Sequence, residues 1–334
     1  KYEQPDTDFP TDVRTMVLQG DTLWIGSLNG LYTYQLKSRQ LNHFDSKQTG
    51  LPHNTIYSII HTKDNQIYIG TYNGLCRYVQ ASEKFENILL PVNRGGSNLF
   101  VNSLLEDTTR QCIWIGMEGY LFQYNPTIGE MKAIEVFHNN SIKSLALDGD
   151  ENLLAGTDNG LYVYQNDKEP LQHIIHDSRN IQSLTNNIIW NIFSDQEHNI
   201  WLGTDYGISL SRYNSALQFV PISQITGTGD GNQFYSLFRD SKGFYWFGGT
   251  NGVIRFTHPA GNKHDAIWYR MGDKNHPLSH NRIRHIYEDR EQQLWIATDG
   301  SINRYDYNTH QFVHYNIVDS TGTYNTNWAY YLFE

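Results

Sequence analysis

The strongest constraint on the fold is a short phrase that recurs along the whole chain of 334 residues. It reads LWIGSLNGLYTY from Leu23, IYIGTYNGLCRY from Ile67, IWIGMEGYLFQY from Ile113, LLAGTDNGLYVY from Leu153, IWLGTDYGISLSRY from Ile200, YWFGGTNGVIRF from Tyr245 and LWIATDGSINRY from Leu294. One small residue holds the same place in every copy, at Gly26, Gly70, Gly116, Gly156, Gly203, Gly248 and Ala297. These anchors are 40 to 49 residues apart, which is the length of a four-stranded β-propeller blade. Shorter solenoid repeats are excluded.

Each repeat divides into four strands joined by short turns. In the second repeat, the expected strands are Ile56–Ile60, Ile67–Thr71, Leu75–Val79 and Lys84–Leu89, with a polar turn at Lys63–Gln66. Sheets that are apolar on both faces must be covered by neighbouring sheets, and radial stacking provides this cover. The sequence therefore predicts an all-β, seven-bladed propeller of antiparallel blades.

The ends of the chain bear on the domain count. Residues 1–326 are expected to form a single propeller. Residues 327–334 resemble the start of another repeat, and we expect them to supply its first strand or a strand that closes the ring. No apolar run approaches the length of about 18 residues that crosses a bilayer, and Lys1 does not open a signal peptide, so we expect a mature or excised soluble piece.

Several residue types inside the repeat are expected to be structural. Asn-Gly pairs, at Asn29, Asn73, Asn159 and Asn251 with the glycines that follow them, predict type I′ hairpins. An aspartate recurs between first and second strands, at Asp64, Asp107, Asp148, Asp195, Asp240 and Asp289, where it accepts backbone N–H bonds. The aromatic anchors Trp24, Tyr68, Trp114, Trp201, Trp246 and Trp295 are expected between blades, and Cys76 and Cys112 are expected to be buried free thiols.

Composition narrows the range of partners. The net charge is −10, which argues against nucleic acid, because that affinity comes from clustered Lys and Arg. Aromatic residues make up 14% of the chain and charged residues 18%, a balance typical of short aromatic-packed strands. A neutral ligand fits this composition better than a phosphate.

The sequence shows no motif for chemistry. On one strand His310 and His314 would lie about 13 Å apart, too far for two ligands of one zinc ion. The run from Asp148 to Asn152 lacks the glycine and glutamate of a calcium loop, and the glycines at 227–231 precede no helix for a dinucleotide. We expect no metal, no cofactor and no catalytic residues, although carboxylate pairs on separate blades have no fixed spacing that would reveal them.

The phrase in IYIGTYNGLCRY and LLAGTDNGLYVY resembles the two-component-regulator propeller repeat, and the resemblance covers nearly the whole chain. It implies the periplasmic sensor part of an inner-membrane hybrid two-component system that responds to oligosaccharides and controls glycan-utilisation genes. It also implies a second propeller and signalling domains in the parent chain, and a homodimer is a further possibility. Blades 3, 4 and 7 depart from the pattern at Gly119, Leu154, Ala297 and Gly300, so distorted loops are expected there.

Ligand residues are expected on the face where the connections between blades gather around the channel. A sugar site combines exposed aromatic rings with a few precisely placed polar groups. The candidates for stacking are Tyr72, Tyr206 and Tyr324. The candidates for hydrogen bonding are Arg94, Asn98, Arg179, Asp205, Gln233, His280, Arg282 and Asp299.

Two other functions stay open on the sequence alone. A protein-interaction scaffold would use one face or the rim for a macromolecular partner, and a propeller lyase or hydrolase would need titratable groups converging with perturbed pKa values. A ligand-sensing module without chemistry of its own is the favoured interpretation.

Overall fold

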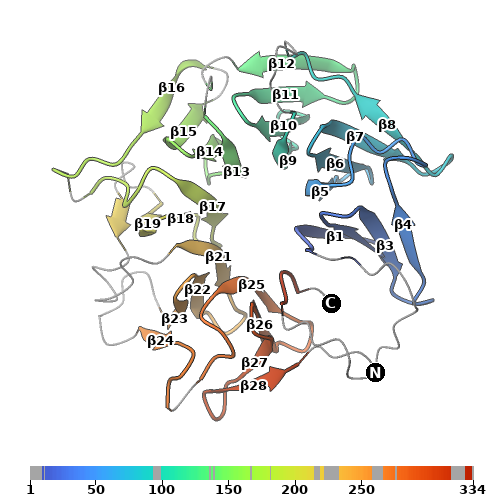
Figure 1. The fold of residues 1–334 in the computed structure, drawn as a ribbon. Helices are drawn as coiled ribbons and strands as arrows, with labels where there is room; N and C mark the ends of the chain where they lie inside the picture. Colours follow the sequence, from blue (N-terminus) through green and yellow to red (C-terminus); the bar gives the residue numbers. More distant parts are fainter. Residues whose placement is uncertain are drawn as a thin grey trace. The chain divides into compact units, whose positions relative to one another are not determined.

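The chain forms seven antiparallel sheets of four strands each, and in every sheet the strands lie in sequence order (Figure 1). The computed structural model describes residues 10, 12–92, 99–134, 137, 140–165, 168–180, 182–213, 219–221, 233–257, 266–274, 277–316 and 328–332. The sheets are the blades of a seven-bladed β-propeller, so the predicted fold class and blade count are confirmed. None of the described residues lies in a helix long and apolar enough to cross a membrane.

Two compact units make up the chain: an N-terminal unit of residues 6–145 and a C-terminal unit of residues 146–334 with residues 1–5. The N-terminal unit holds blade 1 (β1 Thr15–Gln19, β2 Thr22–Gly26, β3 Leu31–Gln35, β4 Leu41–Phe44), blade 2 (β5 Ile56–His61, β6 Ile67–Thr71, β7 Gly74–Val79, β8 Lys84–Ile88) and blade 3 (β9 Val101–Asp107, β10 Cys112–Met117, β11 Leu121–Asn125, β12 Glu130–Ile134). The boundary between the units falls within β13 of blade 4 (β13 Ile142–Leu147, β14 Leu153–Thr157, β15 Gly160–Gln165, β16 Lys168–Ile174).

The C-terminal unit continues with three complete blades. They are blade 5 (β17 Ile189–Ser194, β18 Ile200–Thr204, β19 Gly207–Ser211, β20 Phe219–Pro221), blade 6 (β21 Phe234–Arg239, β22 Tyr245–Gly249, β23 Gly252–Phe256, β24 Ile267–Tyr269) and blade 7 (β25 Ile283–Glu288, β26 Leu294–Thr298, β27 Ile302–Asp306, β28 Gln311–Tyr315). Within each unit the first strands of consecutive blades pack side by side, as β1, β5 and β9 do in one and β17, β21 and β25 in the other.

The small anchor residues hold equivalent positions near the end of each second strand, as predicted. Gly26 faces Ile56, the first residue of the next blade's first strand, and a β-carbon on Gly26 would lie 2.6 Å from the Ile56 side chain. On Gly248 a β-carbon would lie 2.4 Å from Ile283. Real β-carbons do not approach other atoms this closely, so the glycine permits a tight seam between consecutive blades.

The Asn-Gly hairpins differ from the type I′ turns that we expected, and that prediction is wrong. Thr71 pairs with Gly74 across the turn, so the two loop residues are Tyr72 and Asn73, and neither has the positive φ that type I′ requires at both positions. Only Gly74 does, with φ 117°. The Thr71 hydroxyl replaces the expected geometry by accepting the Asn73 N–H at 3.1 Å and donating to the Gly74 carbonyl at 2.9 Å.

The hydrophobic core consists of layers between consecutive blades. In the layer between blades 5 and 6, Trp201 packs with Phe234, Tyr245 and Phe247 and is fully buried. The other anchors Trp24, Tyr68, Trp114 and Trp246 are buried as predicted, whereas Trp295 is half-buried and packs against Tyr315 of its own blade. Leu154 fills the anchor place in blade 4 and is fully buried, and the pairing of β14 with β15 is regular there.

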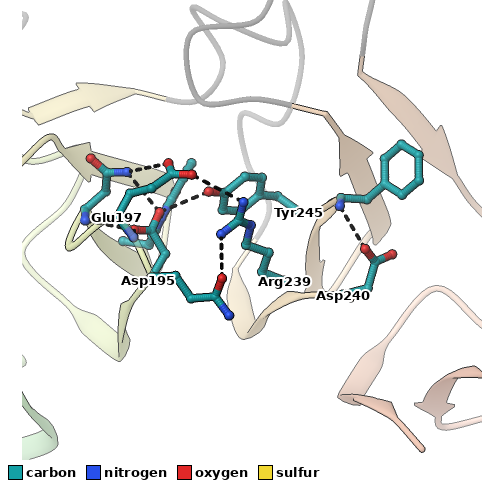
Figure 2. A network of polar contacts seen from close by, with 9 residues as sticks. Asp195, Glu197, Arg239, Asp240 and Tyr245 are labelled. Carbon is teal, nitrogen blue, oxygen red and sulfur yellow. Dashed lines mark hydrogen bonds and ion pairs between the residues drawn. The ribbon is translucent and has the colours of Figure 1, made fainter. Parts of the chain in front are cut away.

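Four of the recurrent aspartates, Asp107, Asp195, Asp240 and Asp289, accept both a backbone N–H of the turn and the indole N–H of the anchor tryptophan, which confirms their structural role. Asp195 accepts the indole N–H of Trp201 at 2.9 Å and the backbone N–H of Asn199 at 2.9 Å. The hydroxyl of Tyr245 in the next blade donates to the same carboxylate at 3.1 Å, next to a contact between Arg239 and Glu197 (Figure 2). A buried indole N–H that keeps a partner avoids a desolvation cost of about 1–3 kcal/mol.

Cys76 and Cys112 are both buried free thiols, as predicted. Burial also raises the pKa of the Cys76 thiol well above its usual range. A protonated buried thiol is a poor nucleophile and packs as a small apolar side chain.

Replacing Trp201 with alanine is expected to lower the free energy of unfolding by about 3–5 kcal/mol, because it empties a buried aromatic site. Chemical denaturation of both proteins measures the difference. Tyr213→Ala is the matched control, since Tyr213 is 39% exposed, and its effect should stay below about 1 kcal/mol. Equal losses in the two variants would contradict the packing described for Trp201.

Asp107 gives a prediction for acid stability. Burial pushes its pKa up, but hydrogen bonds from Trp114 and Arg110 outweigh burial and hold the pKa below the usual value. The stability that the carboxylate contributes is present above the unfolded pKa of about 3.9 and is lost as pH falls through the lower folded pKa. Asp107→Asn should therefore be less stable than the parent at pH 7, and the difference should shrink below about pH 4, as thermal melts across pH would show.

Candidate functional site

Five first strands contain a β-bulge at their second residue. The register with the neighbouring second strand shifts there in blades 2, 3, 5, 6 and 7. The residues left out of the pairing are Tyr57, Asn102, Trp190, Tyr235 and Arg284. A bulge leaves its residue out of the backbone pairing and redirects the side chain, so within each unit these first strands present side chains that ordinary pairing would not.

In the C-terminal unit, the bulge residues of blades 5 and 6 meet through a chain of polar contacts. Trp190 donates its indole N–H to Asp205 at 2.7 Å. The Gln233 amide donates to the same Asp205 oxygen at 3.0 Å, and the Tyr235 hydroxyl donates to the Gln233 carbonyl oxygen. The rings of Trp190 and Tyr235 are 6.0 Å apart, nearly perpendicular. Two aromatic rings are therefore held beside a carboxylate and an amide.

Blade 7 adds two arginines and a second carboxylate. Arg284 donates to both oxygens of Asp299, at 2.6 and 3.0 Å. Arg282 contacts Asp299 only at 3.9 Å, and its side chain is 47% exposed. Asp299 holds the pKa of Arg284 above its usual value, although burial alone would lower it. Asp299 thus fixes Arg284 and leaves Arg282 donors open to other groups.

The contacts around Asp205 and the arginines of blade 7 both affect the hydroxyl of Tyr235. Burial raises the pKa of Tyr235, and Asp205 adds to the rise, while Arg282 and Arg284 oppose it. We call Trp190, Asp205, Gln233, Tyr235, Arg282, Arg284 and Asp299 the bulge cluster. The cluster contains two acidic and two basic side chains, so it offers many hydrogen-bonding groups with no net charge.

Comparison with known proteins identifies the repeats. The model of the two component regulator propeller matches residues 50–73, 183–206, 228–251 and 277–300. Two crystal structures of the extracellular domain of BT4673 from B. thetaiotaomicron are 81% and 82% identical to the chain, cover 98% and 100% of it, and have TM-scores of 0.60. The chain belongs to the two component regulator propeller family.

The matched structures are longer than this chain and are described in two ways. BT4673 is described in one structure as a one component system and in the other as a hybrid two component system. The chain spans 44% and 45% of those two structures. PorZ, a surface component of the type-IX secretion system of Porphyromonas gingivalis, is 14% identical with a TM-score of 0.66, covers 90% of this chain and 47% of its own, and shares the fold. No curated protein sequence matches the chain.

Four residues predicted from this regulator propeller sequence lie together in the bulge cluster: Asp205, Gln233, Arg282 and Asp299. Tyr206 follows Asp205 in its turn and is 54% exposed. His280 accepts the backbone N–H of Arg282 through Nδ1 at 3.0 Å, so it shapes the loop that carries Arg282.

The remaining predicted residues lie elsewhere. Arg179 forms an ion pair with Asp177 of its own loop at 3.2 Å. Arg94, Asn98 and Tyr324 lie outside the described residues. Tyr72 belongs to the N-terminal unit, where its ring lies 4.2 Å from Phe100 and 4.9 Å from His53. It forms a separate aromatic surface in that unit.

Trp190, Tyr235 and Arg284 are residues of the bulge cluster that the repeat phrase does not reveal. A second pattern does mark them, because each stands three residues after an asparagine and directly after an apolar residue: Asn187 and Ile189, Asn232 and Phe234, Asn281 and Ile283. Aligning the repeats on this asparagine would have placed all three at one position.

Several histidines serve the propeller scaffold. His43 stacks on Tyr32 at 4.2 Å, and its Nε2 contacts the Asn29 carbonyl at 3.1 Å. His173 stacks on Tyr162 at 4.1 Å and contacts the Asn159 carbonyl in the same way. Among the described residues, no three His, Cys, Asp or Glu side chains come together as a metal site would require.

The Asp299 contact gives a test of the cluster's rigidity. Asp299→Ala leaves the guanidinium of Arg284 without its two charged hydrogen bonds, and we expect a loss of about 2–3 kcal/mol in the free energy of unfolding. Asp177→Ala is the matched control, because it breaks only the exposed pair with Arg179, so its loss should be much smaller. Denaturant titration of both variants measures the contrast. Two small losses of similar size would show that Asp299 does not fix Arg284.

Proposed function

We propose that this chain is the extracytoplasmic ligand-sensing module of a hybrid two-component system, and that it binds a neutral oligosaccharide at the bulge cluster. The observation that carries the proposal is the placement of Trp190 and Tyr235 beside Asp205, Gln233 and Arg282. Sugars have apolar C–H faces and many hydroxyl groups, so they are bound by aromatic rings next to a few fixed polar groups. The cluster provides both.

The polar groups of the cluster are held in place before any ligand arrives. Asp205 is fixed by Trp190 and Gln233, and Arg284 is fixed by Asp299. Preorganised groups lose little conformational entropy on binding, which favours affinity for a flexible, uncharged ligand. The partly exposed Trp190 offers an apolar surface for a sugar ring.

The relatives support the signalling part of the proposal. BT4673 is described as a signalling system, and the structures that match this chain are of its extracellular domain. We propose the same setting here: a periplasmic module of an inner-membrane protein. Ligand binding to this module would change the activity of signalling domains in the same parent chain, and these domains would control transcription of glycan-utilisation genes. Its partners in that chain would include a second propeller, and the parent would act as a homodimer. The kinase reaction would belong to other domains, and this module would have no catalysis of its own.

Isothermal titration of the chain with a panel of neutral oligosaccharides tests the proposal. Trp190→Ala is expected to weaken binding about tenfold, the equivalent of about 1.4 kcal/mol. The affinity should change little between low and high salt, because an uncharged ligand releases no counterions. Tyr213→Ala, an exposed tyrosine of the same unit that is not in the cluster, should bind as the parent does.

Two results would contradict the proposal. The first is the absence of heat with every oligosaccharide tested. The second is an affinity that falls steeply with salt, which would indicate an anionic ligand. A loss of binding in Tyr72→Ala, with none in Trp190→Ala, would move the site to the aromatic surface of the N-terminal unit.

A further inference from the structure

Residues 328–332 lie on blade 7 in the place that a following first strand would take. The Ala329 N–H donates to the Thr298 carbonyl at 3.0 Å. In blades 1 and 2, the Ile56 N–H donates to the Ser27 carbonyl at 2.9 Å. Ser27 and Thr298 are equivalent residues, each directly after the small anchor. Ala329 therefore makes the backbone contact that Ile56, the first residue of β5, makes in blade 2.

The anchor next to this bond supports the same alignment. Six blades have glycine at the anchor, and the residue that starts the next first strand is large: Ile56, Val101, Ile142, Ile189, Phe234 or Ile283. Blade 7 has Ala297 instead, and residue 329 is alanine; both are buried. The added β-carbon on one side of the seam is matched by a smaller side chain on the other, as close packing requires.

This alignment gives Tyr330 the place of a bulge residue. It follows Ala329 as Tyr57 follows Ile56 and as Tyr235 follows Phe234. Its ring lies 4.4 Å from the guanidinium carbon of Arg284, a cation–π contact within the bulge cluster. Tyr330 therefore extends the row of side chains formed by Trp190, Tyr235 and Arg284.

The next two residues fasten the segment to β25. Tyr331 stacks on His285 at 3.7 Å, and the Leu332 N–H donates to Nδ1 of His285 at 3.3 Å. Burial lowers the pKa of His285 to about 4, so the ring is neutral at pH 7 and can accept this bond.

We propose that residues 328–332 dock on blade 7 as the first strand of a further repeat, and that Tyr330 is a ligand-contacting residue of the bulge cluster. The second part rests on the proposed oligosaccharide function. Because a ligand that touches Tyr330 binds only the docked segment, its binding must stabilise the docking by an equal free energy. The docking of residues 328–332, which follow blade 7 in the sequence, would then depend on whether a ligand is bound.

Hydrogen exchange of the amides of residues 329–332, followed by mass spectrometry, tests the docking without any ligand. Ala329→Ile should lose at least about tenfold in protection, because isoleucine would collide with the β-carbon of Ala297. The double variant with Ala297→Gly should recover the protection, since it restores the pairing of glycine with a large residue. Unchanged protection in Ala329→Ile, or no recovery in the double variant, would overturn the docking.

The oligosaccharide that gives the strongest titration heat with the parent chain then tests the coupling. It should slow exchange at residues 329–332, and Tyr330→Ala should weaken its binding about tenfold, whereas Tyr315→Ala, an exposed tyrosine of the same blade, should not. Binding without any change in exchange, or with full affinity in Tyr330→Ala, would remove Tyr330 from the site and leave the proposed function intact. If no oligosaccharide binds, the proposed function and the ligand role of Tyr330 both fail, and the exchange data on the variants still decide the docking.

Discussion

The architecture depends on one repeated close approach, in which the small anchor at the end of a second strand meets the first residue of the next blade. At Gly26 and Gly248 there is no room for a β-carbon against Ile56 and Ile283. The distance between consecutive blades within a unit is therefore set by the contact between the glycine backbone of one blade and the first side chain of the next. The layers between blades then close on large aromatic anchors such as Trp201, whose indole N–H is satisfied by the aspartate of its own turn.

The same contact explains the position of the bulge residues. The first residue of a first strand is held against the preceding blade, and its third residue pairs with the anchor of its own blade, as Ser58 pairs with Gly70. The residue between them is left without a partner, and a bulge forms there. In the five blades with the bulge, this scaffold contact thus leaves one residue out of the backbone pairing, and its side chain can vary without cost to the seam.

The sequence predicts the scaffold better than the site because the scaffold repeats. The anchors, the four-strand division and the aspartate turns all follow from spacing, and Asp205 and Asp299 stand out because they lie inside the repeated phrase. The prediction of the turn type was wrong because the hydroxyl of Thr71 hydrogen-bonds across the turn. The Asn-Gly pair alone does not indicate this interaction. Residues of a strand normally alternate between two faces, and a bulge interrupts this alternation at one residue. The alternation alone therefore does not predict where the side chains of Trp190 and Arg284 point.

The internal charge balance of the bulge cluster bears on what it selects. Arg284 and Asp299 are joined by two short bonds, and Asp205 is held by two donors. An anionic ligand that bound Arg284 would have to compete with Asp299 for it, and removing one partner of a largely buried pair costs more than an exposed contact returns. An uncharged ligand leaves the pair intact and can use the open donors of Arg282 and the ring faces of Trp190 and Tyr235. Under the proposed function, hydroxyl groups would therefore bind at Arg282 while the pair of Arg284 with Asp299 stays intact.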